Sequence, residues 1–240
     1  MRYTPKNNAR GFSLVEILVV VAILVAVMAL AFPIFGKIRQ RSDMIRCSSN
    51  LRAMGVAIFA YAADHDGLLP GPTVGDQYSY YSAAHVEAAM QTGTTSRPLL
   101  AFLVPYLNLP VPTESGRRNE AFFPAVAECP ATKREILATD GKITKDNVKY
   151  FTAVATRITE GGEAIDIRPF GYSSSSVTNP TLPKKLGALK QPASVVGLRD
   201  KTFGVHDGVT NMLLMDGSVI GLREGQYETF NATGGILRIK

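Results

Sequence analysis

The first quarter of the chain carries two helical patterns of different polarity. Residues 12–35 form an almost unbroken run of apolar side chains that contains a single charge, Glu16. As a helix, this run would be about 36 Å long, enough to cross a hydrocarbon core of about 30 Å. The core helix of a soluble domain is rarely apolar on every side over such a length. The run therefore predicts a transmembrane helix over residues 12–35.

A secretory signal peptide is the main alternative, because Arg2, Lys6 and Arg10 form a basic stretch in front of the run. The apolar region of a signal peptide is usually about 7–15 residues long, and a cleavage site with small residues follows it. Here the run is longer and ends in Ala-Phe-Pro-Ile-Phe. We therefore expect the segment to stay with the protein.

The second pattern is that of an amphipathic helix. Residues 37–43 are polar on nearly all sides, and apolar residues then recur at alternating steps of three and four. This stripe consists of Met44, Cys47, Leu51, Met54, Ile58 and Tyr61, whereas Arg46, Ser49, Asn50 and Arg52 lie off it. A coiled coil is a weaker alternative, because fewer than three heptads are present. The two patterns together predict one helix from Phe12 to Ala62 that ends before Gly67 and Pro70.

The remaining residues indicate short helices and strands. Residues 81–91 and 98–107 have helical patterns, and residues 148–158, 194–199 and 235–239 have strand composition. Two apolar runs, Thr210–Met215 and Ser218–Leu222, flank Asp216-Gly217, which predicts a β-hairpin. Residues 108–119 and 159–168 are predicted to be loops. The expected fold class is α+β, with a long N-terminal helix packed on an antiparallel sheet.

Charge and motif searches narrow the function. The chain has 26 Lys and Arg against 20 Asp and Glu, a formal charge of +6, and three of these basic residues lie in the first ten positions. This excess predicts a solvated basic surface rather than a nucleic-acid partner. No G-x-x-x-x-G-K-[ST], G-x-S-x-G or H-E-x-x-H sequence is present, and the chain has three histidines. We therefore expect no catalytic residues, and the protein is not expected to be an enzyme.

The N-terminus contains a basic leader, Gly11, Phe12, a carboxylate at Glu16 and an apolar helix, in that order. This order resembles the prepilin signature of type IV pilins and type II secretion pseudopilins. The resemblance implies a leader at residues 1–11, cleavage after Gly11 and methylation of Phe12. It implies that Glu16 neutralises the terminal amine of a neighbouring subunit, a favourable pairing for charges that leave water together. It also implies a helix bend at Pro33, since proline removes a backbone donor.

The resemblance also implies a location and partners. The N-terminus would be cytoplasmic, residues 12–35 would cross the bacterial inner membrane once, and the pilin-like head at 36–240 would be periplasmic before joining a filament. The partners would be a prepilin peptidase, membrane lipid, copies of the chain and other pilin-like subunits, and the assembly platform and motor. The basic residues after the run, among them Lys37 and Arg39, outnumber those before it, which by itself would predict the opposite orientation.

A second resemblance concerns the two cysteines, Cys47 and Cys129. Cys47 begins the run Cys-Ser-Ser-Asn-Leu-Arg, which is followed by Tyr61, Asp64, Gly67 and Pro70. This pattern resembles pilin-like proteins of planctomycetes and verrucomicrobia, in which a C-x-x-N-L-x-x-[LM]-G-x-A run follows the prepilin helix and a Cys-Pro recurs in mid-chain. Two buried thiols are one interpretation, because free cysteine behaves as a small hydrophobe. An even number of cysteines in an oxidising compartment favours a Cys47–Cys129 disulfide.

The C-terminal hairpin resembles the H-x9-DG element of the same proteins. The histidine is His206, and the Asp-Gly pair is Asp216-Gly217. One interpretation is that His206, Asn211 and Asp216 hold the hairpin by side-chain hydrogen bonds. The alternative is a metal or ligand site, although two candidate ligands ten residues apart do not define a coordination sphere. No cofactor is expected. Calcium occurs in some pseudopilin heads, but its ligands cannot be matched here.

The predicted function is that of a structural subunit of a type IV pilus or a type II secretion pseudopilus. The alternative is a membrane-tethered head that does not polymerise and that binds a ligand or catalyses a reaction at the C-terminal hairpin. A third possibility is a DNA-binding minor pilin, which only the small excess of basic over acidic residues supports. The sequence does not distinguish a secretion pseudopilus from a surface pilus, or a major subunit from a minor one.

Overall fold

The computed structural model describes residues 13–73, 80–90, 97–111, 116–143, 155–172, 181–200, 205–230 and 236–239. Its helices are α1 (Leu14–Asp64), α2 (Ala83–Met90), α3 (Leu99–Leu103), η1 (Ala125–Ala127), α4 (Pro130–Asp140), η2 (Leu186–Ala188) and η3 (Pro192–Ser194). Its strands are β1 (Ala155–Glu160), β2 (Glu163–Ile167), β3 (Val196–Arg199), β4 (Val209–Leu214), β5 (Val219–Arg223), β6 (Tyr227–Phe230) and β7 (Ile236–Ile239). The chain divides into two compact units, Met1–Arg41 and Ser42–Lys240, which are described separately.

The first unit contains the N-terminal part of α1. Helix α1 is bent between Leu30 and Phe35, an interval that contains Pro33, in agreement with the predicted bend. In the part of the chain that the structure describes, no single helix is both long and apolar enough to cross a membrane. The bent pair Leu14–Leu30 and Phe35–Asp64 meets that requirement by length and composition.

The C-terminal half of α1 confirms the predicted stripe. Cys47, Leu51, Met54 and Ile58 are buried, whereas Met44 and Tyr61 are partly buried. The off-stripe residues Arg46, Ser49 and Arg52 are exposed. The helix ends two residues later than predicted, and Gly67 follows it with a φ of +78° and donates its N–H to the carbonyl of Ala62. Glycine adopts this left-handed conformation without the strain that a side chain would add.

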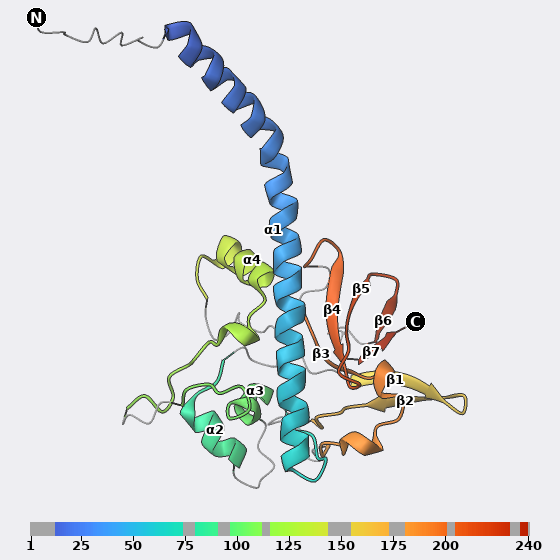
Figure 1. Cartoon of the computed structure of the whole chain (residues 1–240). Coiled ribbons are helices and arrows are strands. Elements are labelled where there is room, and N and C mark those ends of the chain that lie inside the picture. Colours follow the sequence, from blue (N-terminus) through green and yellow to red (C-terminus); the bar gives the residue numbers. More distant parts are fainter. Residues whose placement is uncertain are drawn as a thin grey trace, which may run out of the picture. The chain divides into compact units, whose positions relative to one another are not determined.

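In the second unit, residues 42–64 of α1 lie between a group of helices and the strands (Figure 1). Helices α2, α3 and α4 are on one side, and the strands are on the other. Tyr61 stacks edge-on against Phe102 of α3, and a Cβ atom at Gly55 would lie 2.9 Å from Leu213 of β4. Gly55 therefore permits a close approach of α1 to β4, and α1 forms the centre of the fold. The fold class is α+β, as predicted.

The strands form two sheets. One has the order β3-β4-β5 and is antiparallel, with β4 and β5 joined by the predicted Asp216-Gly217 hairpin. The other has the order β2-β1-β7-β6, in which β1 and β7 pair in parallel and the remaining pairs are antiparallel. Strand β4 is buried on both faces. Leu213 joins the core around α1, while Met212 and Leu214 join a smaller cluster near β6 and β7.

Several expectations were wrong in detail. Residues 159–168 are not a loop, because β1 continues to Glu160, turns through Gly161-Gly162 and returns as β2. Both glycines have positive φ, as a two-residue hairpin turn requires. Helix α4 and strand β6 were not predicted. The predicted helices at 81–91 and 98–107 are confirmed as the shorter α2 and α3, and the strands at 194–199 and 235–239 as β3 and β7. Of the strand predicted at 148–158, residues 148–154 lie outside the described part.

Candidate functional site

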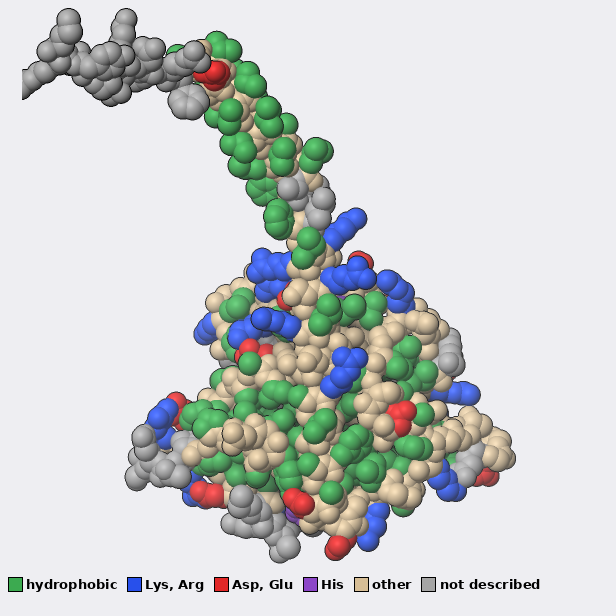
Figure 2. Space-filling model, in the orientation of Figure 1, with side chains coloured by type: hydrophobic (Ala, Val, Ile, Leu, Met, Phe, Trp, Pro, Cys, Tyr) green, Lys and Arg blue, Asp and Glu red, His purple; other side chains and the backbone are tan. Residues whose placement is uncertain are grey.

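The N-terminal part of α1 presents apolar side chains to its surroundings. Every described residue from Ser13 to Leu30 is exposed, and the exposed fraction of Leu14 is 81%. Figure 2 shows hydrophobic side chains along the visible face of this segment. Exposed apolar surface of this extent is a feature of interaction or membrane-contacting segments. Gly11 and Phe12, the predicted processing residues, lie outside the described residues.

Glu16 lies in the first turn of α1, where it interacts with Ser13. The backbone N–H of Ser13 donates to Glu16 Oε2 at 2.8 Å, and the N–H of Val15 donates to Ser13 Oγ at 3.4 Å. This is a capping box, in which Ser and Glu three positions apart satisfy free donors at the helix start. The Ser-x-x-Glu spacing of Ser13 and Glu16 is the sequence signal of such a box. Glu16 therefore has a local structural role besides the role in assembly that the resemblance implies.

Three successive turns of α1 contact α4 and the segment that leads into it. Asp43 forms an ion pair with Arg134, Cys47 is joined to Cys129 by a disulfide with a Cα–Cα distance of 5.2 Å, and Asn50 donates from Nδ2 to two carbonyl oxygens. Cys129 precedes Pro130 at the start of α4, where proline is well tolerated because the first helical N–H has no partner. The disulfide closes a loop between residues 82 positions apart.

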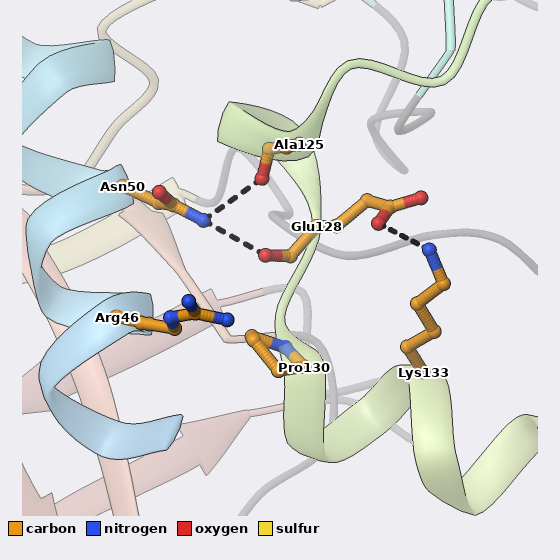
Figure 3. A pocket seen from close by; sticks show the side chains of 6 residues that line it. All are labelled: Arg46, Asn50, Ala125, Glu128, Pro130 and Lys133. Atoms are coloured by element: carbon orange, nitrogen blue, oxygen red, sulfur yellow. Dashed lines mark hydrogen bonds and ion pairs between the residues drawn. The ribbon is translucent and has the colours of Figure 1, made fainter. Parts of the chain in front are cut away.

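A pocket of about 360 Å³ lies next to this contact (Figure 3). Its walls are residues of α1, η1 and the start of α4: Arg46, Asn50, Ala125, Glu128, Pro130 and Lys133. Asn50 Nδ2 reaches the carbonyl oxygens of Ala125 at 3.0 Å and Glu128 at 2.8 Å. Lys133 Nζ lies 2.6 Å from Glu128 Oε2. Asn50, Glu128 and Lys133 thus already have polar partners in the wall of the pocket.

His206 lies in a buried polar cluster next to the disulfide. Its Nε2 atom is 3.4 Å from Cys129 Sγ and 3.3 Å from Asp200 Oδ2. Asp200 Oδ2 also accepts hydrogen bonds from the backbone N–H and side-chain Nδ2 of Asn211, at 2.9 and 3.0 Å. Each of these four residues is buried. The side chains of Cys47, Cys129, Asp200 and His206 therefore meet in one part of the core. One sulfur, oxygen or nitrogen atom of each lies within 4.8 Å of the corresponding atoms of the other three.

Asp216 and Gly217 do not belong to this cluster. They form the turn that follows β4, whereas His206 precedes β4, so the two ends of the H-x9-DG element lie at opposite ends of one strand. Asp216 Oδ1 accepts hydrogen bonds from Ser218 Oγ at 2.7 Å and from the Ser218 N–H at 2.9 Å. These bonds hold the pKa of Asp216 below its ordinary value. The structure therefore brings His206 and Asn211 together with Asp200, and it does not bring Asp216 to them.

No sequence pattern predicted that Asp200 belongs to a site. Asp200 lies 71 residues from Cys129 and 153 residues from Cys47, and no short motif connects these positions. Its Oδ1 atom and the Nδ1 atom of His206 are buried and have no hydrogen-bond partner among the described residues. Unpaired polar atoms in a core are uncommon and need an explanation.

Comparison with known proteins decides how the N-terminus is interpreted. Residues 6–32 match the family profile described as the prokaryotic N-terminal methylation motif. The N-terminus therefore carries a prepilin-type cleavage and methylation motif, in which the chain is similar to type IV pilins. The motif and the apolar helix that it includes indicate a membrane or pilus location.

A stretch of 114 residues is 29% identical to the type IV major pilin protein PilA of Myxococcus xanthus strain DK1622. The similarity covers 45% of this pilin-like chain and 51% of PilA, so the chain spans about half the length of that relative. No solved structure matches. Similarity to a pilin favours a structural protein over an enzyme. The resemblance to planctomycete and verrucomicrobial proteins stays an expectation.

Proposed function

We propose that the protein is a subunit of a type IV pilus or type II secretion pseudopilus, cleaved after Gly11 and methylated at Phe12. The observation that carries the proposal is the exposed apolar half of α1 behind a methylation motif. Such a segment can lie in lipid as an anchor and then pack against identical segments in a filament core. A helical fibre requires a head-to-tail contact that does not close on itself, and a protruding helix can provide that contact.

In this proposal, Pro33 shapes the assembling helix, and Glu16 pairs with the methylated amine of Phe12 in a neighbouring subunit. A carboxylate in apolar surroundings is costly unless a positive charge accompanies it. The precursor is single-pass, with its head on the periplasmic side of the inner membrane. Its partners are prepilin peptidase, its own copies and other pilin-like subunits, and the assembly platform and motor.

The capping box allows a sharp test of Glu16. Glutamine at this position keeps the capping box, because Gln also accepts from the Ser13 N–H, but it removes the charge. We expect Glu16→Gln and Glu16→Ala to insert into membranes normally and both to abolish filaments in a shearing assay. Glu16→Gln separates the roles of the residue: filaments of normal abundance from this variant would assign Glu16 to helix capping instead of subunit pairing.

Mass spectrometry of the native N-terminus tests the processing step. A mature chain that begins with a methylated Phe12 is the expected result, and a Gly11→Val variant should retain its leader. An intact leader on the native protein would favour the second candidate function, a tethered head that does not polymerise. That candidate has the Cys-His-Asp cluster in its favour. However, His206 is 2% exposed, so a substrate has no direct access to its ring.

A further inference from the structure

The four side chains around the disulfide have the composition of a structural metal site. Cys47 comes from the middle of α1, Cys129 from the start of α4, Asp200 from the end of β3 and His206 from the turn before β4. Two sulfurs, an imidazole nitrogen and a carboxylate oxygen are ligands that Zn²⁺ takes in four-coordinate sites. Calcium prefers oxygen ligands and does not suit this set.

The distances agree with a tetrahedral ion. Zinc–ligand distances of about 2.0–2.3 Å place neighbouring ligand atoms about 3.3–3.8 Å apart. Nε2 of His206 lies 3.4 Å from Cys129 Sγ and 3.3 Å from Asp200 Oδ2, and the four ligand atoms are within 4.8 Å of one another. In the disulfide the sulfurs are bonded to each other, so they have to separate before both can bind a metal.

The surroundings favour a cation at this point. The four side chains are at most 2% exposed, which is typical of closed structural sites. Asp200 is held in place by two hydrogen bonds from Asn211, the kind of outer contact that orients a metal-binding carboxylate. Asp200 is a buried carboxylate, and the only titratable nitrogen that the structure places against it is His206 Nε2, at 3.3 Å from Oδ2 among the described residues. Its second oxygen, Oδ1, is buried without a partner there, so a cation between Asp200 and His206 would lower the cost of burying the charge. The amino end of α4 lies at Cys129 and favours negative charge on its sulfur.

We propose that Cys47, Cys129, Asp200 and His206 bind Zn²⁺ when the disulfide is reduced. Reduction converts the disulfide into two thiols and needs two electrons and two protons. An external dithiol supplies both and is itself oxidised to a disulfide, whereas a phosphine supplies the electrons and becomes the phosphine oxide, with the oxygen and the two protons coming from water. Binding of the metal then releases both thiol protons, so that two thiolates, one carboxylate and a neutral imidazole surround the ion. In this proposal, the disulfide cross-links the core under oxidising conditions, and the bound Zn²⁺ ion cross-links it under reducing conditions. The proposal is independent of whether the chain polymerises.

Cobalt titration of the full chain in mild detergent tests this site. Protein reduced with a phosphine should bind one equivalent of Co²⁺ with the visible bands of a tetrahedral ion and thiolate-to-cobalt charge-transfer bands, and Zn²⁺ should displace it. The disulfide-bonded protein should bind none at this site. Loss of an outer contact already lowers metal affinity about 10–100-fold, so His206→Ala and Asp200→Asn should each weaken binding of Co²⁺ by at least about tenfold.

His65→Ala is the matched control, because His65 is exposed and stacks on Tyr61 outside the cluster. It should bind Co²⁺ like the unchanged protein. Circular dichroism is recorded at each step. A reduced chain that is unfolded alone and folds on addition of Co²⁺ supports the site. A reduced chain that binds no stoichiometric Co²⁺, folded or unfolded, overturns it, as does binding that His206→Ala and Asp200→Asn leave unchanged.

Discussion

At the residue scale, Gly217 shows how one position serves both a turn and a packing contact. Its φ is +91°, and a Cβ atom there would lie 3.0 Å from the Phe59 ring of α1. The hairpin turn therefore contacts α1 at a glycine, because glycine tolerates both the positive φ and the close approach of Phe59. Gly225 has the same φ of +91°, but a Cβ atom there would meet open space.

Alanine variants at these two positions separate the cost of backbone strain from the cost of the contact with Phe59. We expect Gly225→Ala to lower the free energy of unfolding by about 1–2 kcal/mol through backbone strain. Gly217→Ala should lower it by about 1 kcal/mol more, since Phe59 has to move. Urea unfolding of both variants, followed by circular dichroism, measures the difference. Equal losses would mean that Phe59 adjusts without cost and that the turn does not depend on α1.

A pH-dependent contribution comes from Asp166 on β2, which lies opposite Arg157 on β1. Arg157 Nε is 2.7 Å from Asp166 Oδ1, and this hydrogen bond lowers the pKa of Asp166. A carboxyl whose pKa is lower in the folded than in the unfolded chain stabilises the fold above the unfolded value, about 3.9. That stability is lost as the pH falls through the lower, folded value.

Asp166→Asn should therefore cost about 0.5–1 kcal/mol at neutral pH, because the pair is partly exposed to solvent. The difference from the unchanged protein should shrink as the pH falls below about 4. Urea midpoints of the two proteins between about pH 7 and pH 3 test this. A difference that stays constant over the pH range would contradict the assignment.

At the element scale, α1 and α4 are held together by contacts on successive turns of one helix. Asp43, Cys47 and Asn50 lie on one face of α1 because three or four residues make a turn. Asn50 is the member of this face that donates to two carbonyl oxygens, and after its loss the oxygen of Ala125 still accepts from the Glu128 N–H. It therefore reports on the contact without breaking the disulfide.

Asn50→Ala should lower the free energy of unfolding by about 1–2 kcal/mol. Ser49→Ala, at the exposed neighbouring position, should change it by less than about 0.5 kcal/mol. Thermal unfolding of the oxidised proteins measures both. If the two variants unfold at the same temperature, the hydrogen bonds to Ala125 and Glu128 add nothing to the contact between the helices.

Local sequence patterns predicted some elements and missed others for identifiable reasons. The hairpin of β4 and β5 was predictable, because Asp216-Gly217 lies between two apolar runs. The hairpin of β1 and β2 has an equally strong Gly161-Gly162 turn, but β2 is exposed over most of its length. Its charged residues were interpreted as loop residues. Helix α4 is also polar on most of its surface, and it is held by the disulfide and by Arg134 rather than by an apolar stripe.

At the scale of the whole molecule, sequence distance limits what can be predicted. The α1 stripe and the N-terminal motif consist of neighbouring residues, so periodicity and spacing revealed them. The cluster of Cys47, Cys129, Asp200 and His206 is assembled from distant parts of the chain, and its geometry arises from tertiary packing and the disulfide. A single sequence contains no signal that links Asp200 to His206 and the cysteines. The pairing of β1 with β7 in parallel depends on long-range contacts in the same way.

The division of the chain into two units leads to a prediction about the whole molecule. Every described residue from Ser13 to Leu30 is exposed, whereas the buried stripe begins after Arg41. Removal of residues 1–41 therefore takes away the apolar surface and leaves the core around Cys47, Leu51 and Leu213 intact. We expect chain 42–240 to be a monomer without detergent and to unfold cooperatively with its disulfide formed.

A second truncation provides the control. Chain 50–240 loses Asp43 and Cys47, and with them the ion pair to Arg134 and a disulfide worth about 4 kcal/mol for a loop of this length. It should unfold at a clearly lower temperature or aggregate. Light scattering after size exclusion, together with thermal melts, compares the two chains. Aggregation of chain 42–240 would show that the fold depends on residues 1–41. Equal stability of the two chains would show that the contact between α1 and α4 is dispensable. A stable 42–240 beside a weak 50–240 would place the boundary of the independently folding unit between Arg41 and Asn50.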